Sequence, residues 1–180
     1  MSYLEISLIQ PVQDHYLPEL CDALERAFHF PTRVSRSDLK VAEHFNPAIS
    51  QYNCSSLLLA LITKPPPGAV KILGVTEVDL GEPIFDFIFG EAQLDGFGAI
   101  LSTYRLLNEL YGLPPDRNLL VQRLIKEALH EVGHTFGLIH CFQPHCVMNP
   151  STFVEQIDTK SEHFCRQCRT SLDEKLETLL

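Results

Sequence analysis

The sequence predicts an α+β fold, in which a mixed β-sheet packs on helices and a small C-terminal lobe follows. Segments with strand-like apolar patterns alternate with segments of helical spacing over residues 1–137. Regular patterns thin out after Gly137, and four of the six cysteines lie beyond it. The chain has 180 residues, of which 45% are hydrophobic, and this suits one compact domain. We therefore expect a single domain, residues 1–180, with lobes at residues 1–137 and 138–180.

The N-terminal lobe is expected to supply the sheet and two helices. Its first strand is rich in Ile, Leu and Val and ends at Pro11, and Asp14 with Pro18 is typical of a helix start. Three consecutive prolines in Lys64–Gly68 should stop the second helix. In chain order the expected elements are a strand at Leu4–Val12, helices at Leu17–Phe28 and Asn46–Ile62, and strands at Val70–Val78, Phe85–Ala92 and Gly98–Thr103.

A longer helix is predicted at Leu119–Phe136, where apolar residues recur at helical spacing after Asp116 and Asn118. Beyond it we expect a loop over Met148–Asp158 and a short terminal helix at Asp173–Leu179.

The long helix ends in a motif that indicates zinc chemistry. Residues His130–Cys141 read H-E-V-G-H-T-F-G-L-I-H-C. On a helix, His130 and His134 are one turn apart and face the same way, so both imidazoles can reach one ion. Glu131 lies on the neighbouring face, close enough to contact a water at the metal without ligating it. This is the zincin arrangement.

His140 can be a third ligand only if the helix stops. In a straight helix it would lie about 9 Å beyond His134, because each residue rises about 1.5 Å, whereas zinc–nitrogen bonds are about 2.0–2.1 Å long. Gly137 stands where the chain must turn, since glycine accepts the left-handed conformation that ends helices. A surface cluster of histidines without metal is the alternative interpretation.

The late cysteines predict a second metal site. Cys141 and Cys146 are followed by Cys165 and Cys168, a spacing typical of a tetrahedral four-thiolate zinc site. Cys141 follows His140 directly, and neighbouring side chains outside a helix tend to point to opposite sides. Adjacent residues could thus bind two different ions.

Other interpretations of these cysteines stay open. The four could form two disulfides, Cys165 and Cys168 could form a thioredoxin-like redox pair, and His145 or His163 could replace one thiolate. Cys21 and Cys54 lie in apolar stretches without a partner nearby, and we expect buried free thiols there.

The motif H-E-x-x-H-x-x-G-x-x-H, followed by a methionine, resembles the signature of the metzincins. With Cys141, Cys146, Met148 and the pair Cys165 and Cys168, the chain resembles the archaemetzincins, small two-zinc metallopeptidase-like proteins. The resemblance implies a sheet with a mostly parallel core and an antiparallel edge strand, and Met148 in a tight turn beneath the histidines without ligating.

The resemblance also gives Phe85–Ala92 a second role, as the edge strand that binds substrate peptide by strand addition. The alternative is that Phe85, Phe87 and Phe89, which share one face by period two, pack the core. A tyrosine that some metzincins place after the methionine turn is missing, because the last tyrosine is Tyr111. The oxyanion donor is therefore unassigned.

Composition bounds the location and the partners. A net charge of −9 argues against a nucleic-acid partner. No secretory signal is visible, and the longest apolar run, Leu57–Ile62, is too short to span a membrane. We expect a soluble cytoplasmic protein, where reduced cysteines favour metal over disulfide. The sequence does not give the oligomeric state, and the metal at the histidines could be another divalent ion.

The predicted function is a zinc-dependent metallopeptidase that cleaves peptide or protein substrates. Glu131 would act as general base and then as general acid on a water that the zinc activates, and a second zinc would be structural. The alternative is a catalytically restrained or inactive two-zinc protein that binds a peptide or protein partner. An intact Glu131 favours catalysis, whereas the lack of a visible pro-segment favours restraint.

Overall fold

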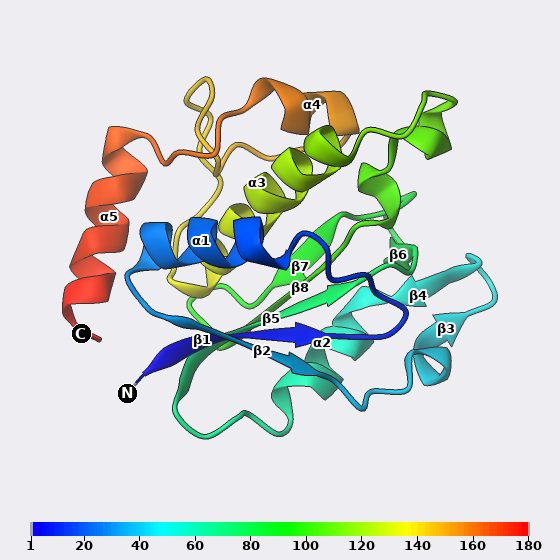
Figure 1. Cartoon of the computed structure of the whole chain (residues 1–180), viewed down its shortest axis with the longest axis horizontal. Helices are drawn as coiled ribbons and strands as arrows, with labels where there is room; N and C mark the ends of the chain where they lie inside the picture. Colours follow the sequence, from blue (N-terminus) through cyan, green and yellow to red (C-terminus); the bar gives the residue numbers. More distant parts are fainter. Residues whose placement is uncertain (1, 180) are drawn as a thin grey trace.

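The computed structural model describes residues 2–179, and its centre is a five-stranded sheet (Figure 1). The strand order is β2-β1-β5-β8-β7. All neighbours are parallel except β7, which runs antiparallel to β8 at one edge. This confirms the predicted mostly parallel sheet with an antiparallel edge strand. The strands are β1 (Tyr3–Leu8), β2 (Thr32–Arg36), β5 (Ala69–Thr76), β7 (Gly90–Ala92) and β8 (Gly98–Ser102).

Helices cover both faces of this sheet. Along β5, Leu73 and Val75 pack in one hydrophobic cluster with α1 (Leu17–Phe28) and α3 (Arg117–Thr135), because alternate side chains share a face. Ile72 points the other way and packs in a second cluster with α2 (Cys54–Ile62). The sheet therefore lies between the α1–α3 layer and α2, and α3 crosses it with its C-terminal end near β7 (Figure 1).

The second helix is shorter than the predicted Asn46–Ile62, because residues 46–53 belong to two short strands and the turn between them. Pro47 and the positive φ of Ser50, 57°, interrupt the helical pattern. Asn53 begins the helix, since its side chain accepts a hydrogen bond from Ser56 N at 2.7 Å. The displaced residues build a small three-stranded sheet of β3 (Phe45–Asn46), β4 (Gln51–Asn53) and β6 (Leu80–Gly81), after a 3₁₀ turn at Val41–His44.

Strand β2 was not predicted. Its residues are polar and mostly exposed, so it lacks the apolar pattern that marks a strand. Parallel main-chain pairing with β1 holds it at the sheet edge, together with side-chain contacts such as the hydrogen bond from Ser35 to Glu5 and the packing of Arg33 over the Tyr3 ring. Helix α1 has the predicted bounds, Leu17–Phe28, but the expected N-cap was wrong: Tyr16 is the N-cap residue, and the Asp14 carboxylate pairs with Arg36 at 2.9 Å.

The predicted strand Phe85–Ala92 is reduced to its last three residues. Turn hydrogen bonds precede it, with Phe85 N donating to Glu82 O at 3.0 Å and Ile88 N to Leu80 O at 3.1 Å. Period two therefore does not apply to the aromatic residues. Phe89 is 4% exposed and belongs to the core, Phe87 is partly buried against it, and Phe85 is 57% exposed. The core interpretation is thus wrong for Phe85.

The C-terminal segment holds more helix than predicted. Helix α4 (Val154–Thr159) lies within the expected loop, where Gln156 Oε1 accepts hydrogen bonds from Thr152 N at 2.6 Å and Phe153 N at 3.1 Å. Helix α5 (Arg166–Glu177) begins seven residues before the predicted Asp173, directly after Cys165. Two further 3₁₀ turns occupy Tyr104–Leu106 and Asn108–Tyr111, before α3.

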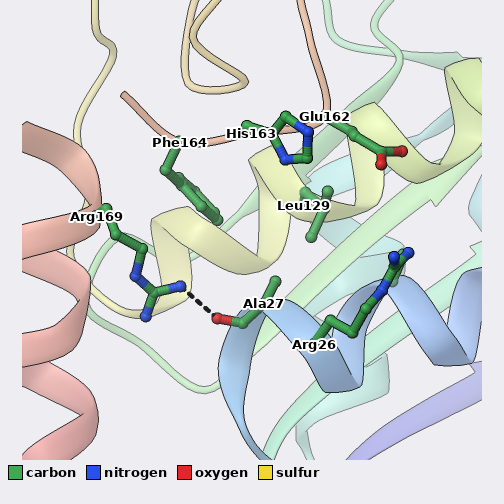
Figure 2. A pocket seen from close by; sticks show the side chains of 8 residues that line it. Arg26, Ala27, Leu129, Glu162, His163, Phe164 and Arg169 are labelled. Atoms are coloured by element: carbon green, nitrogen blue, oxygen red, sulfur yellow. Dashed lines mark hydrogen bonds between the residues drawn. The ribbon is translucent and has the colours of Figure 1, made fainter. Parts of the chain in front are cut away.

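Helix α5 docks on the N-terminal half of the molecule. Figure 2 shows Arg169 reaching across a groove to α1, where its Nη1 donates to the Ala27 carbonyl at 2.7 Å. The hydrophobic cluster that contains Leu73 and Val75 of β5 also includes Phe28, Met148 and Leu172. One core therefore joins the sheet-bearing half to the C-terminal segment. Within residues 2–179, no helix combines the length and the apolar character needed to cross a membrane.

Candidate metal centres

Helix α3 presents two imidazoles to one point in space. The Nε2 atoms of His130 and His134 lie 3.1 Å apart. Two ligands of a tetrahedral zinc with bonds of about 2.0–2.1 Å are separated by about 3.3–3.4 Å. The ligand nitrogens of His130, His134 and His140 all lie within 4.8 Å of one another. The donor set therefore fits a zinc ion with three imidazole ligands.

Main-chain carbonyls fix the orientation of both helical imidazoles. The Nδ1 of His130 bonds to the Val147 carbonyl at 2.9 Å, and the Nδ1 of His134 bonds to the Leu138 carbonyl at 2.7 Å. A carbonyl only accepts, so each Nδ1 carries the proton and each Nε2 keeps its lone pair for a metal. Burial lowers the pKa of His130 well below its usual value, and it also lowers the pKa of His134 and of His140. Neutral imidazoles are the form that ligates.

The turn that brings His140 back occurs at Gly137. This residue has a φ of +88°. Its N–H donates to the His134 carbonyl at 2.9 Å, and Leu138 N donates to Gly133 O at 3.2 Å, so the helix ends in a left-handed cap. The sequence-based expectation of a sharp turn at this glycine is what the backbone adopts.

Glu131 lies beside the three histidines in a cleft of about 390 Å³ that β7 borders. It is buried, and burial, followed by the charge of Glu127, raises the pKa of its carboxyl well above the usual value. Gly90 makes room for it, because a Cβ atom there would lie 3.0 Å from Glu131 Cγ. A residue with a side chain at position 90 would push against the carboxylate.

Lys160 was missed by sequence reasoning. Its ammonium is buried beneath the site, 2.8 Å from Glu127 Oε1, and it donates to the Asn149 carbonyl at 3.2 Å. Its charge is close enough to contribute to the lowered pKa of His130. Nothing in the sequence marked this lysine, because it follows a helix that was expected to be a loop.

Met148 occupies the position that the family resemblance implied. It is buried under α3, where a Cβ atom on Gly133 would lie 2.7 Å from its sulfur. Its turn closes through Asn149 N, which donates to Cys146 O at 2.9 Å. Two glycines, at positions 90 and 133, thus let the chain approach α3 closely on two sides.

The second cluster gathers four thiols. The sulfurs of Cys141, Cys146, Cys165 and Cys168 lie within 4.8 Å of one another, and those of Cys141 and Cys165 are 3.7 Å apart. Zinc–sulfur bonds of about 2.3 Å predict about 3.8 Å between two ligands of a tetrahedral site. A disulfide would bring two sulfurs to about 2.05 Å, and all six cysteines are free.

The four thiols differ in how readily they ionise, because burial raises the pKa of Cys146 and of Cys168 whereas the pKa of Cys165 is lowered. Cys165 N donates to the Cys146 sulfur at 3.3 Å. Hydrogen bonding from the Cys168 backbone lowers the pKa of Cys165 to about 7. Neither His145 nor His163 belongs to this cluster, and the His145 ring bonds instead to the Thr159 carbonyl at 2.9 Å. Of the remaining thiols, Cys54 is buried as expected, and Cys21 is partly buried against the core.

The two clusters share one short segment. Val147 orients His130, and the Met148 carbonyl accepts from Cys141 N at 2.9 Å. Cys146 precedes both and contributes to the thiol cluster. His140 and Cys141 are neighbours in the chain but belong to different clusters. The segment Cys146–Met148 therefore contacts residues of both clusters.

Comparison with known proteins shows which family the chain resembles. Residues 62–174 match the model of Peptidase family M54. The archaemetzincin of Methanocaldococcus jannaschii is 40% identical over 93% of this chain and 92% of its own length. The archaemetzincin of Pyrococcus furiosus is 46% identical over 76% of this chain, which spans 65% of that relative.

Solved structures agree. A zinc-dependent peptidase from Methanocorpusculum labreanum superposes with a TM-score of 0.81 and 34% identity, covering 94% of this chain and 99% of its own. The archaemetzincin of Methanopyrus kandleri gives a TM-score of 0.84 with 29% identity, covering 98% and 96%. A family match over more than half of the sequence and relatives of this similarity lead to one assignment: the chain belongs to peptidase family M54, the archaemetzincins, and is a metallopeptidase.

Proposed function

We propose that the chain hydrolyses peptide bonds at a zinc ion held by His130, His134 and His140, with Glu131 as general base and acid. The observation that carries the proposal is the placement of a buried carboxyl group beside three imidazoles in one cleft. A protein that only binds partners has no chemical need for that carboxyl group. Neutral, oriented imidazoles leave room for a water as a fourth ligand.

When bound, zinc would lower the pKa of a water and polarise the substrate carbonyl. Glu131 takes the proton of the attacking water and returns it to the departing amine. Burial raises the pKa of its carboxyl, which favours the step in which Glu131 carries the proton and returns it to the amine. Gly90 and the surrounding core hold the carboxylate in place and keep bulk water away.

The edge strand β7 is the proposed platform for substrate. Ser102 N donates to Phe89 O at 2.9 Å and Gln93 N to Gly98 O at 3.0 Å, so residues 89, 91 and 93 face β8. By alternation, the main-chain groups of Gly90 and Ala92 point to the free edge. A peptide can add there as a further strand next to the histidines.

We further propose a structural zinc at Cys141, Cys146, Cys165 and Cys168, which makes two ions per chain. The sulfur separations support it. This site would organise residues 138–180 as a small lobe on the sheet-bearing residues 1–137 of a single catalytic domain. The proposed location is the cytoplasm, which six free thiols favour.

Cleavage of a diverse peptide mixture, analysed by mass spectrometry, tests the proposal. The zinc-loaded protein is compared with the same protein after chelation and with Glu131→Gln prepared identically. We expect products with the loaded wild type only, restored when zinc is returned to the chelated sample. Equal products in all three samples would mean a contaminating protease. No products from wild type with both zincs in place would favour the binding-only alternative.

A further inference from the structure

Two large apolar side chains stand exposed at one end of the active-site cleft. Leu94 is 58% exposed and Ile139 is 68% exposed. Both line the same cavity as the three histidines and Glu131. Exposed apolar side chains that line a functional cleft are candidates for ligand contact.

The two side chains are held near each other by the end of α3. Leu94 lies in the turn after β7, and Asp95 of that turn donates its N–H to the His134 carbonyl at 2.9 Å. Lys175 of α5 holds the Asp95 carboxylate at 3.1 Å. Ile139 follows the Gly137 turn, and a Cβ atom on Gly137 would lie 3.2 Å from Asp95 Oδ1. The turns that carry Leu94 and Ile139 are therefore in direct contact.

The apolar surface continues beyond the histidines. Ile139 and His140 also line a neighbouring cavity of about 450 Å³, in which Phe142 is exposed. No lysine, arginine, aspartate or glutamate lines that cavity. The charged groups of the Leu94 turn, Asp95 and its partner Lys175, are paired with each other at 3.1 Å. An apolar substrate side chain placed against the exposed Leu94 and Ile139 would remove apolar surface from water on both sides.

The direction of β7 determines which part of an added peptide lies at the Leu94 end of the cleft. The strand runs from Gly90 towards Leu94, so a peptide added antiparallel to it has its N-terminal residues at the Leu94 end. Antiparallel pairing is the slightly more stable arrangement. We propose that this cleft selects peptides with a large apolar side chain on the N-terminal side of the cleaved bond, seated between Leu94 and Ile139. The inference rests on the proposed peptidase function.

Peptide pairs that differ at one position test the selection. Each pair carries leucine or serine immediately before or immediately after the cleaved bond, and kcat/KM is measured for wild type, Leu94→Ser and Leu113→Ser. Leu113 is the matched control, because it is 54% exposed and lies outside the cleft. A site that buries such a side chain prefers leucine by about tenfold or more. In wild type and Leu113→Ser, we expect leucine to be preferred over serine at the position immediately before the cleaved bond. In Leu94→Ser, we expect this preference to be lost while the zinc content stays unchanged.

Two results would overturn the inference and leave the peptidase function intact. One is cleavage with no preference for leucine over serine before the bond, and the other is a preference that Leu94→Ser retains. A second measurement does not depend on turnover. Amine-blocked leucine hydroxamate and serine hydroxamate place their side chains on the N-terminal side of a zinc-binding group. We expect the leucine compound to bind the zinc-loaded protein about tenfold more tightly. Equal affinities would exclude the apolar seat even if no peptide is cleaved.

Discussion

The histidine cluster and the cysteine cluster differ in how completely protein surrounds the ion that each could hold. His130 and His134 come from one helix and His140 from the turn after it, and all three border an open cleft. The four cysteines come from two segments on either side of α4, and together they could supply four protein ligands to one ion. A three-ligand site that opens on a cleft leaves a coordination position for chemistry, and a four-ligand site leaves none. Loss of the first should silence the protein, whereas loss of the second should unfold part of it.

The largest effect on function should come from Glu131→Gln. Removing a general base costs about 10²–10⁴-fold in rate, and both zincs should remain because neither cluster loses a ligand. The control is Glu127→Gln, which neutralises another buried carboxylate one turn earlier on α3. It leaves Lys160 without its partner and should lower thermal stability more than it lowers the rate per folded molecule. Equal rates for wild type and Glu131→Gln would remove Glu131 from the chemistry.

On the cysteine side, Cys165→Ser should reduce zinc to one ion per chain and destabilise the protein by about 4 kcal/mol or more, because metal binding there is folding free energy. Cys21→Ser is the control, since Cys21 is a partly buried thiol outside the cluster. It should keep two zincs and shift stability by about 1 kcal/mol or less. Elemental analysis and thermal unfolding measure both. Unchanged zinc and stability in Cys165→Ser would refute the structural site.

Substitution at the turn between the clusters should have an intermediate effect. Gly137→Ala places a side chain at a φ of +88°, which costs about 1–2 kcal/mol, and it displaces His140. Gly112→Ala is a close match, because its φ is +73° and nothing lies within 4 Å of the added Cβ. Both variants should lose similar stability, but only Gly137→Ala should lose zinc affinity at the histidines. Equal zinc affinity would show that a glycine at position 137 is not needed to place His140.

The smallest effect concerns pH in the metal-free protein. The pKa values of His130, His134 and His140 are lowered by burial, so below about pH 6.5 the unfolded chain binds more protons than the folded one. Stability should therefore fall as pH drops from 7 through the lowered pKa values. The raised pKa of Glu131 acts in the opposite sense, so the measurement uses Glu131→Gln as background. The free energy of unfolding is measured by chemical denaturation at several pH values, with and without His134→Asn. An equal fall in stability at low pH in both proteins would show that the buried histidines do not cause it.

The grouping of the histidines and of the cysteines follows from their spacing in the sequence, and that they bind metal stays a prediction. One helical turn aligns His130 with His134, and Gly137 signals the break before His140. Lys160 and the placement of Leu94 were not predictable. Lys160 reaches Glu127 only because α4 forms where a loop was expected. The turn that carries Leu94 is fixed to the end of α3 by a hydrogen bond from Asp95 N to the His134 carbonyl, which joins segments far apart in the sequence. Strand β2 escaped prediction because its residues are polar and mostly exposed, so it lacks the apolar pattern of a strand.

The segment Cys146–Met148 has a thermodynamic consequence. It contributes a thiol to one cluster, a carbonyl to His130 in the other, and a carbonyl that holds Cys141 next to His140. A metal that orders this segment at the cysteines lowers the entropy lost when a metal binds the histidines. The linkage must be reciprocal, so occupancy of the histidines tightens the cysteine site by the same factor. The order in which the two sites fill, and not only their separate affinities, would then control how much of the chain is active when zinc is scarce.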